Sequence, residues 1–262
     1  MQKPEKVVSY ASGPSVLINQ LCHEIGFEDL LNALLPWDPI RCHLSPGTRL
    51  KALVINILTS QTPLYRVEHF YREQDVEWLF GASVQAHDFN DDALGRALDK
   101  LHQATPWKVY STLALEAAKT FDLSLGTLQN DTTSFSLYGE YGRESQLNID
   151  RGHSKDHRPD VKQILLGMRV TPERIPILAN VENGNLDDKT WNFTFIQKMR
   201  EALSLEMWEN LTYVADSALI TQTNLQLLND PRVPFVSRLP DTFKVSEEVK
   251  RTAWAADEWQ KI

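Results

Sequence analysis

The spacing of apolar residues changes near Phe121, and this change divides the chain. Before Phe121, apolar residues recur three and four positions apart, which is typical of helices packed on one face. Three of the expected helices cover residues 13–34, 65–80 and 106–120. Another follows residue 44, with Ser45 as its cap and Pro46 at its first helical position. A further one is capped by Asp91 or Asp92. In the helix that begins at Pro46, the apolar stripe would consist of Leu50, Leu53, Val54, Ile57 and Leu58. We therefore expect a helical N-terminal domain over residues 1–122.

After Phe121, short apolar runs alternate with turn residues. Strand-like runs occupy residues 123–138, 163–170, 174–180, 211–215 and 234–239, and helical patterns occupy residues 186–205 and 221–228. The resulting order, β-β-β-α-β-α-β, predicts a mixed sheet flanked by helices. The expected fold class is therefore α/β, with the helical domain followed by a mixed-sheet domain over residues 123–262.

The charge and hydropathy of the chain exclude some classes of protein. The net charge is −8, from 27 basic and 35 acidic residues, which argues against a surface that is basic throughout. No uncharged apolar run approaches the roughly 18 residues of a membrane span, and residues 1–10 lack the apolar segment of a signal peptide. We expect a cytoplasmic protein with no membrane partner.

The two cysteines do not form a disulfide framework, and each precedes a histidine, as Cys22-His23 and Cys42-His43. These are zinc-binding side-chain types, but the C-x-x-C spacing of a zinc site is missing. Ordinary helix and loop residues are therefore the preferred interpretation.

Two aspartates, Asp131 and Asp216, each follow a strand-like apolar run. A carboxylate at the end of a buried strand is costly unless it is paired. If the first and fourth strands are neighbours, the two carboxylates meet at one edge and could hold two Mg²⁺ or Mn²⁺ ions about 4 Å apart. The alternative is that each aspartate caps the next turn or helix. Thr132 could orient the first carboxylate, whereas Thr133 is simply a favourable strand residue.

Residues 152–160 are rich in donors for phosphate groups, among them Lys155, His157 and Arg158. Between Arg143 and Arg174 there are seven Lys or Arg and five Asp or Glu, which reverses the sign of the whole chain's charge. This segment predicts contacts with a DNA backbone. The alternative is a solvated loop with internal ion pairs.

The sequence Asn-Gly-Asn at residues 183–185 predicts a tight turn, because glycine and asparagine tolerate the positive φ that such a turn needs. Asp187 is expected to cap the following helix, in preference to serving as a third acid near the site. The aromatic residues that follow are expected in the core: Trp191, Phe193, Phe195 and Trp208.

Several stretches together resemble bacterial insertion-sequence transposases of the DDE type, in the branch with a downstream Y-R-E-K signature. The specific stretches are residues 130–134 (NDTTS), 152–160 (GHSKDHRPD), 182–187 (ENGNLD) and 214–218 (VADSA). The helical part is similar to that branch's N-terminal domain at residues 44–47 (LSPG), 53–58 (LVINIL) and 63–65 (PLY). The resemblance covers most of the chain.

The resemblance implies a ribonuclease-H-like core in which Asp131 and Asp216 are the first two members of a D-D-E triad. It implies Mg²⁺- or Mn²⁺-dependent cleavage and transfer of DNA strands, with terminal inverted repeats and target DNA as partners. The Y-R-E-K element is absent, because no tyrosine follows Tyr213 and the remaining glutamates do not fit the Y-x-x-R-x-x-x-E frame. We therefore expect a C-terminally truncated, incomplete core that is inactive alone. We also expect exposed apolar surface that favours a homo-oligomer.

Two other functions fit parts of the sequence. A non-catalytic transposase remnant that binds DNA or oligomerises would depend on the helical domain. A phosphatase of the haloacid-dehalogenase type would use Asp131 as nucleophile, but such enzymes have an aspartate two residues later, where this chain has Thr133.

Overall fold

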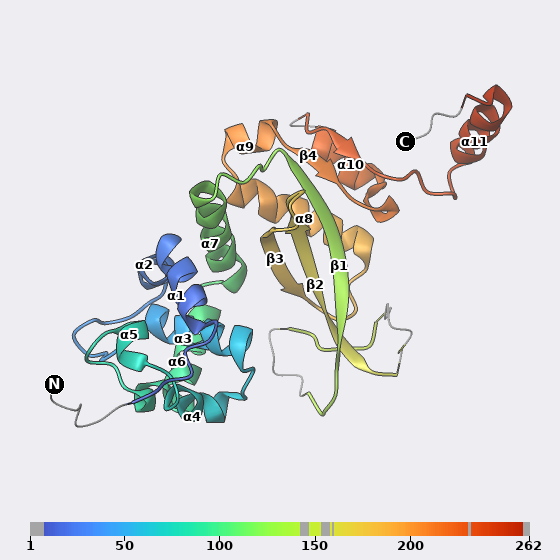
Figure 1. Ribbon diagram of the computed structural model, residues 1–262. Helices are drawn as coiled ribbons and strands as arrows, with labels where there is room; N and C mark the ends of the chain where they lie inside the picture. The colour runs from blue at the N-terminus through green and yellow to red at the C-terminus, as the bar shows by residue number, and fades with distance from the viewer. Residues whose placement is uncertain (1–7, 142–146, 153–157, 159, 230–231, 259–262) are drawn as a thin grey trace. The chain divides into compact units, whose positions relative to one another are not determined.

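The computed structural model describes residues 8–141, 147–152, 158, 160–229 and 232–258. The chain forms two compact units, Met1–Thr120 and Phe121–Ile262. The first unit is helical and the second contains the β-sheet (Figure 1). The expected fold class, a helical N-terminal part followed by a mixed α/β sheet, is therefore confirmed. Within the described residues, no helix has the length and apolarity to cross a membrane.

The helices of the first unit surround an aromatic core. They are α1 (Ser15–Glu24), α2 (Phe27–Leu34), α3 (Pro46–Thr59), α4 (Val67–Tyr71), α5 (Val76–Phe80), α6 (Asp91–Gln103) and α7 (Pro106–Thr120). The ring centroid of Tyr71 lies 4.6 Å from that of Phe89 and 5.5 Å from that of Phe80. The Tyr71 hydroxyl donates to the Ala52 carbonyl at 2.7 Å, so the buried polar group is satisfied.

The helix starts are only partly those that the sequence predicts. Ser45 caps α3 as expected, with its Oγ accepting from the Thr48 amide at 3.1 Å. The cap of α6 is Asn90 and not Asp91 or Asp92, because the Asn90 Oδ1 accepts from the Ala93 amide at 2.9 Å. Residues 13–34 form two helices, since Gly26 adopts a left-handed φ of 65° between them.

Two further expectations for this unit are wrong. Residues 65–80 do not form one helix, because a turn with Asp75 as the next cap separates α4 from α5. In α3, Ile57 and Leu58 are exposed by 59% and 62%, whereas Ile55 and Asn56 are buried. The buried face of α3 is therefore rotated from the one that the apolar spacing indicates, because tertiary packing and not spacing selects the face.

The second unit is built on a mixed sheet. Its strands are β1 (Thr127–Leu137), β2 (Lys162–Val170), β3 (Pro176–Glu182), β4 (Thr212–Val214) and β5 (Phe235–Val236), in the order β3-β2-β1-β4-β5. The first three pair antiparallel, whereas β4 runs parallel to β1 and β5 parallel to β4. This order and these directions are those of a ribonuclease-H-like sheet, and they make β1 and β4 neighbours.

Four helices accompany the sheet: α8 (Asp188–Ala202), α9 (Leu205–Glu209), α10 (Gln222–Asn229) and α11 (Lys244–Ala256). The sequence predicts α8 and α10 but neither α9 nor α11. Parallel β4 and β5 need a crossover, which α10 provides. Of the described residues of α11, Ser246 alone is buried.

One face of the sheet is covered by α8 (Figure 1). A Cβ added to Gly167 on β2 would lie 2.0 Å from the Trp191 Nε1, so α8 and β2 pack too closely for any residue with a Cβ at this position. Trp191 also stacks on Phe195, with ring centroids 4.6 Å apart. The core placement of Trp191, Phe195 and Trp208 is confirmed, and Phe193 is half-buried.

The turn at residues 183–185 depends on glycine for a different reason from the expected one. Gly184 does not adopt a positive φ. A Cβ there would instead lie 1.9 Å from the Gln163 carbonyl oxygen, so close backbone approach requires glycine. Asp187 acts as a helix cap, as predicted, with its Oδ1 accepting from the Thr190 amide at 3.0 Å.

Candidate functional site

The two aspartates of interest lie at equivalent positions on neighbouring strands. The parallel pairing of β1 with β4 ends at Gln129 and Val214. Asp131 and Asp216 each follow two residues later. Asp131 shares the face of Gln129 by strand alternation, and Asp216 lies just beyond the end of β4. Both aspartates line one pocket of about 570 Å³. The strand order therefore brings together two carboxylates that are far apart in the sequence.

The pocket combines these acids with apolar side chains. Its lining consists of Gln129, Asn130, Asp131, Thr132, Thr133, Met168, Val170, Val214, Ala215 and Asp216. Asp131 lies within β1 and not at its end, and both aspartates are exposed. Asp131 thus lies inside its strand and Asp216 follows the end of β4, as the sequence indicated. The expected burial is wrong for Asp131, because β1 is buried on only one face. No burial cost requires a metal here.

Each carboxylate makes a local backbone hydrogen bond. Asp131 Oδ1 accepts from the Thr132 amide at 2.7 Å. Asp216 Oδ1 accepts from the Ala218 amide at 3.0 Å and caps the short 3₁₀ turn Ser217–Leu219. Asp216 therefore caps the following turn, as one of the two sequence interpretations predicted. The hydrogen bond also fixes the direction of its carboxylate at the rim of the pocket.

The pair of carboxylates fits a hydrated hard cation. Mg²⁺ is commonly bound through one or two carboxylates, with water and substrate phosphates completing its shell. Across the described part of the chain, no group of three or more His, Cys, Asp or Glu is placed to hold a metal ion. The donor set therefore suits a partly hydrated ion and not an all-protein cage.

A buried polar network lies beside the pocket, and one of its members, Asn130, also contributes to the pocket lining. Arg169 on β2 pairs with Asn130 on β1, and its Nε donates to the Asn130 Oδ1. The Asn130 Nδ2 donates to the Val214 carbonyl at 2.7 Å. Burial lowers the pKa of Arg169 to about 10. The sequence does not predict this network, because Arg169 is there only one of the basic residues near the predicted DNA-contact segment.

The predicted DNA-contact residues are only partly described. Lys155 and His157 lie outside the described residues. Arg158 is exposed and forms a two-point ion pair with Asp160, in which Nε–Oδ1 and Nη2–Oδ2 are both 2.9 Å. The pair raises the pKa of Arg158 and lowers that of Asp160 to about 2. A phosphate that binds Arg158 must compete with this carboxylate, which agrees with the solvated-loop alternative.

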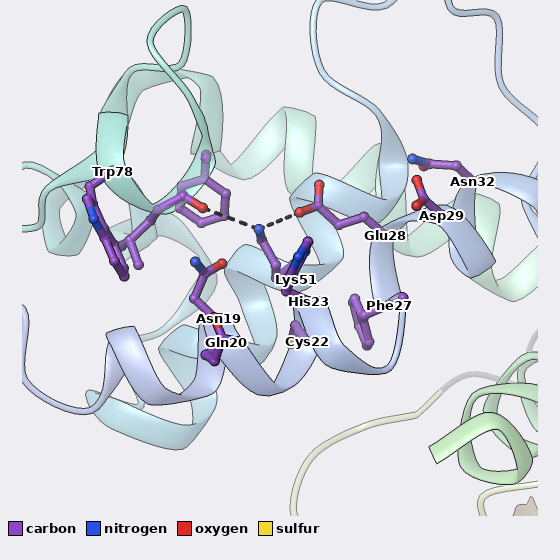
Figure 2. A pocket seen from close by; sticks show the side chains of 13 residues that line it. Asn19, Gln20, Cys22, His23, Phe27, Glu28, Asp29, Asn32, Lys51 and Trp78 are labelled. Atoms are coloured by element: carbon purple, nitrogen blue, oxygen red, sulfur yellow. Dashed lines mark hydrogen bonds and ion pairs between the residues drawn. The ribbon is translucent and has the colours of Figure 1, made fainter. Parts of the chain in front are cut away.

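The helical unit contains a second pocket, of about 560 Å³, shown in Figure 2. At its centre the nearly buried Lys51 ammonium pairs with Glu28 and donates to the Leu79 carbonyl at 3.3 Å. Its Nζ also lies 4.8 Å from the centre of the Phe80 ring. These contacts join α2, α3 and α5, so Lys51 has a clear structural role.

The cysteine–histidine pairs gain no support as a zinc site. Among the described residues, which include all four of these side chains, no group of three or more metal-ligand residues is placed to hold an ion. Burial raises the pKa of the Cys22 thiol to about 11, which opposes the thiolate that zinc binds.

Comparison with known proteins gives matches to one family and to solved structures. Residues 15–115, less than half of the chain, match a family described as a domain of unknown function (DUF4277). No curated protein matches in a sequence search.

Three similar solved structures are transposase complexes. The Mos1 transposase paired-end complex with left transposon end is 8% identical, with a TM-score of 0.30 over 86% of this chain and 75% of that one. The Mos1 mariner paired-end complex with Mn is 10% identical, with a TM-score of 0.31 over 96% and 92%. A synaptic complex of piggyBac transposase with hairpin DNA is 12% identical, with a TM-score of 0.41 over 90% and 53%. The function proposed below rests on the chain's own geometry.

Proposed function

We propose that the second unit is the core of a DDE-type DNA transposase of the insertion-sequence kind, which cuts and joins DNA strands with divalent metal ions. The observation that carries the proposal is the position of Asp131 and Asp216. Each lies two residues beyond the point where β1 and β4 stop pairing with each other, and both line one pocket. The ribonuclease-H-like strand order and the sequence resemblance support the same function.

In this proposal Asp131, within β1, and Asp216, just beyond β4, hold the cation between them. The bound Mg²⁺ or Mn²⁺ supplies activation of a water or a 3′-hydroxyl and stabilisation of the leaving oxygen. The Thr132 amide orients Asp131, and the cap on Ser217–Leu219 orients Asp216. Lys155, His157 and Arg158 are proposed to contact the backbone of terminal inverted repeats or of target DNA.

The activity of this chain by itself is expected to be low. Two carboxylates bind a metal ion less tightly and less rigidly than a full ligand set. The described residues supply no third acid at this pocket. We therefore expect weak metal binding and little strand cleavage.

The exposed apolar surface favours a second candidate, a non-catalytic transposase remnant that binds DNA or self-associates. Phe135 and Val181 on the open face of the sheet are exposed by 49% and 42%, and Val249 on α11 by 56%. Such surface is typical of association sites. This function would persist in an Asp131→Ala/Asp216→Ala variant.

Metal binding tests the proposal directly. Paramagnetic resonance of free Mn²⁺ should show binding by the full chain that is lost in Asp131→Ala and in Asp216→Ala. Glu206→Ala, which removes an exposed acid outside the pocket, is the matched control. Equal Mn²⁺ binding by all four proteins would contradict the proposed site. Cleavage of duplex DNA carrying the inverted repeats beside the gene should depend on the same two aspartates.

A further inference from the structure

We propose that Asn130 and Arg169 are positioning residues that set the spacing between Asp131 and Asp216. This inference rests on the proposed function, because it assigns a purpose to a buried pair that adjoins the pocket, and one of the two, Asn130, also lines it. Neither residue touches solvent at more than 7% of its surface. Both act through the backbone that carries the aspartates.

Asn130 continues the link between β1 and β4 where their backbone pairing ends. The paired positions of the two strands are Thr127–Thr212, Leu128–Tyr213 and Gln129–Val214. One residue further along β1, the Asn130 Nδ2 donates to the Val214 carbonyl at 2.7 Å and to the Leu128 carbonyl at 3.2 Å. A side chain thereby holds the two strands together immediately before the two aspartates.

Arg169 determines which way the Asn130 amide points. The Arg169 Nε donates to the Asn130 Oδ1, so the amide nitrogen must face Val214. The arginine itself is held between rings, 4.5 Å from the centre of Tyr213 and 5.3 Å from that of Phe195. Tyr213 in turn donates to the Asn192 Oδ1 at 3.0 Å and so connects β4 to α8.

The burial of Arg169 is costly for the fold. Its exposed fraction is 0%, and Nη1 and Nη2 have no hydrogen-bond partner among the described residues. A buried charge without full pairing commonly destabilises a protein relative to an apolar residue of similar volume. Stability alone gives little reason for an arginine here in place of an apolar residue, whereas the orientation of Asn130 requires its donor.

The test compares metal affinity with stability in the full chain, with MnCl₂ as the probe. Asn130→Ala and Arg169→Met should each weaken Mn²⁺ binding roughly 10- to 100-fold, as is usual when groups supporting metal ligands are removed. Arg169→Met removes a buried charge but leaves the buried Asn130 Oδ1 without its donor, so the two effects oppose each other and the melting temperature should change little. Arg169→Lys keeps a donor and should retain more affinity than Arg169→Met.

Gln163→Met is the matched control, since Gln163 is a buried polar residue on the same strand and face but does not line the pocket. It should change stability without changing Mn²⁺ affinity. Unchanged Mn²⁺ affinity in both Asn130→Ala and Arg169→Met would overturn the inference. An equal loss of affinity in Gln163→Met would also overturn it, because stability alone would then explain the effect.

A second readout separates this inference from the proposed function. The Ala215 amide donates to the Val236 carbonyl at 3.2 Å, just beyond the Asn130 link. Asn130→Ala should speed hydrogen exchange at Ala215, whether or not a metal binds. If the unaltered chain binds no Mn²⁺, the proposed function fails and this exchange rate decides the inference: faster exchange supports it and an unchanged rate refutes it.

Discussion

The two faces of the sheet in the second unit differ in almost every property. On the face under α8, the β1 and β2 residues are buried except for the half-buried Ser136, and Gly167 lies against the Trp191 ring. On the opposite face none of the β1 and β2 side chains is buried, and Asp131 and the pocket lie there. The two faces therefore have different roles: the covered face packs against α8 and stabilises the sheet, and the open face exposes Asp131 and the pocket to solvent.

The largest expected effect comes from neighbouring leucines that point to opposite faces. Leu165→Ala, on the covered face, should reduce the free energy of unfolding by about 3 kcal/mol because it leaves a cavity. Leu166→Ala, on the half-exposed face, should reduce it by about 1 kcal/mol. Urea denaturation of both variants measures the difference. Equal losses would mean that the open face is covered in solution.

A slightly smaller effect is expected at the closest approach of helix and strand. Gly167→Ala places a Cβ 2.0 Å from the Trp191 Nε1, so α8 must move. We expect a loss of about 2 kcal/mol in the free energy of unfolding. Gly95→Ala is the control, since a Cβ there meets no heavy atom within 4 Å. A destabilised control with an unaffected Gly167→Ala would contradict the described packing.

On the open face, stability and metal binding should separate. Asp131→Asn should change the free energy of unfolding by less than about 0.5 kcal/mol, because the side chain is exposed. Saturating Mn²⁺ should raise the melting temperature of the unaltered chain but not of the variant, since a ligand of the folded state stabilises it. A Mn²⁺ shift that survives in Asp131→Asn would place the ion elsewhere.

The smallest effect concerns the exposed Arg158–Asp160 pair. The guanidinium holds the pKa of Asp160 near 2, below its ordinary value of 3.8. A carboxylate with a depressed pKa in the folded state contributes stability above its unfolded pKa and loses it as the pH falls toward 2. This contribution should be barely measurable in an exposed pair. An NMR titration of Asp160 should show its pKa rise in Arg158→Ala, and an unchanged pKa would contradict the pairing.

The elements of the second unit were largely predictable, whereas their surroundings were not. Alternating apolar residues marked β1, whereas the pairing of β1 with β4 was only a condition of the predicted site until the structure showed it. The exposure of Asp131 was not predictable, because alternation gives two faces but not the one that a helix covers. In α3, the apolar spacing likewise failed to show that Ile57 and Leu58 are exposed.

The residues of the candidate site also fall into two groups, those that the sequence predicted and those that only the structure revealed. The sequence by itself singled out Asp131 and Asp216, because an acid after an apolar run is a local signal. Only the tertiary structure placed Asn130 and Arg169 beside them, since that contact depends on the antiparallel register of β1 and β2 across 39 residues. Local pattern determines which elements form, whereas long-range pairing and burial decide which side chains meet.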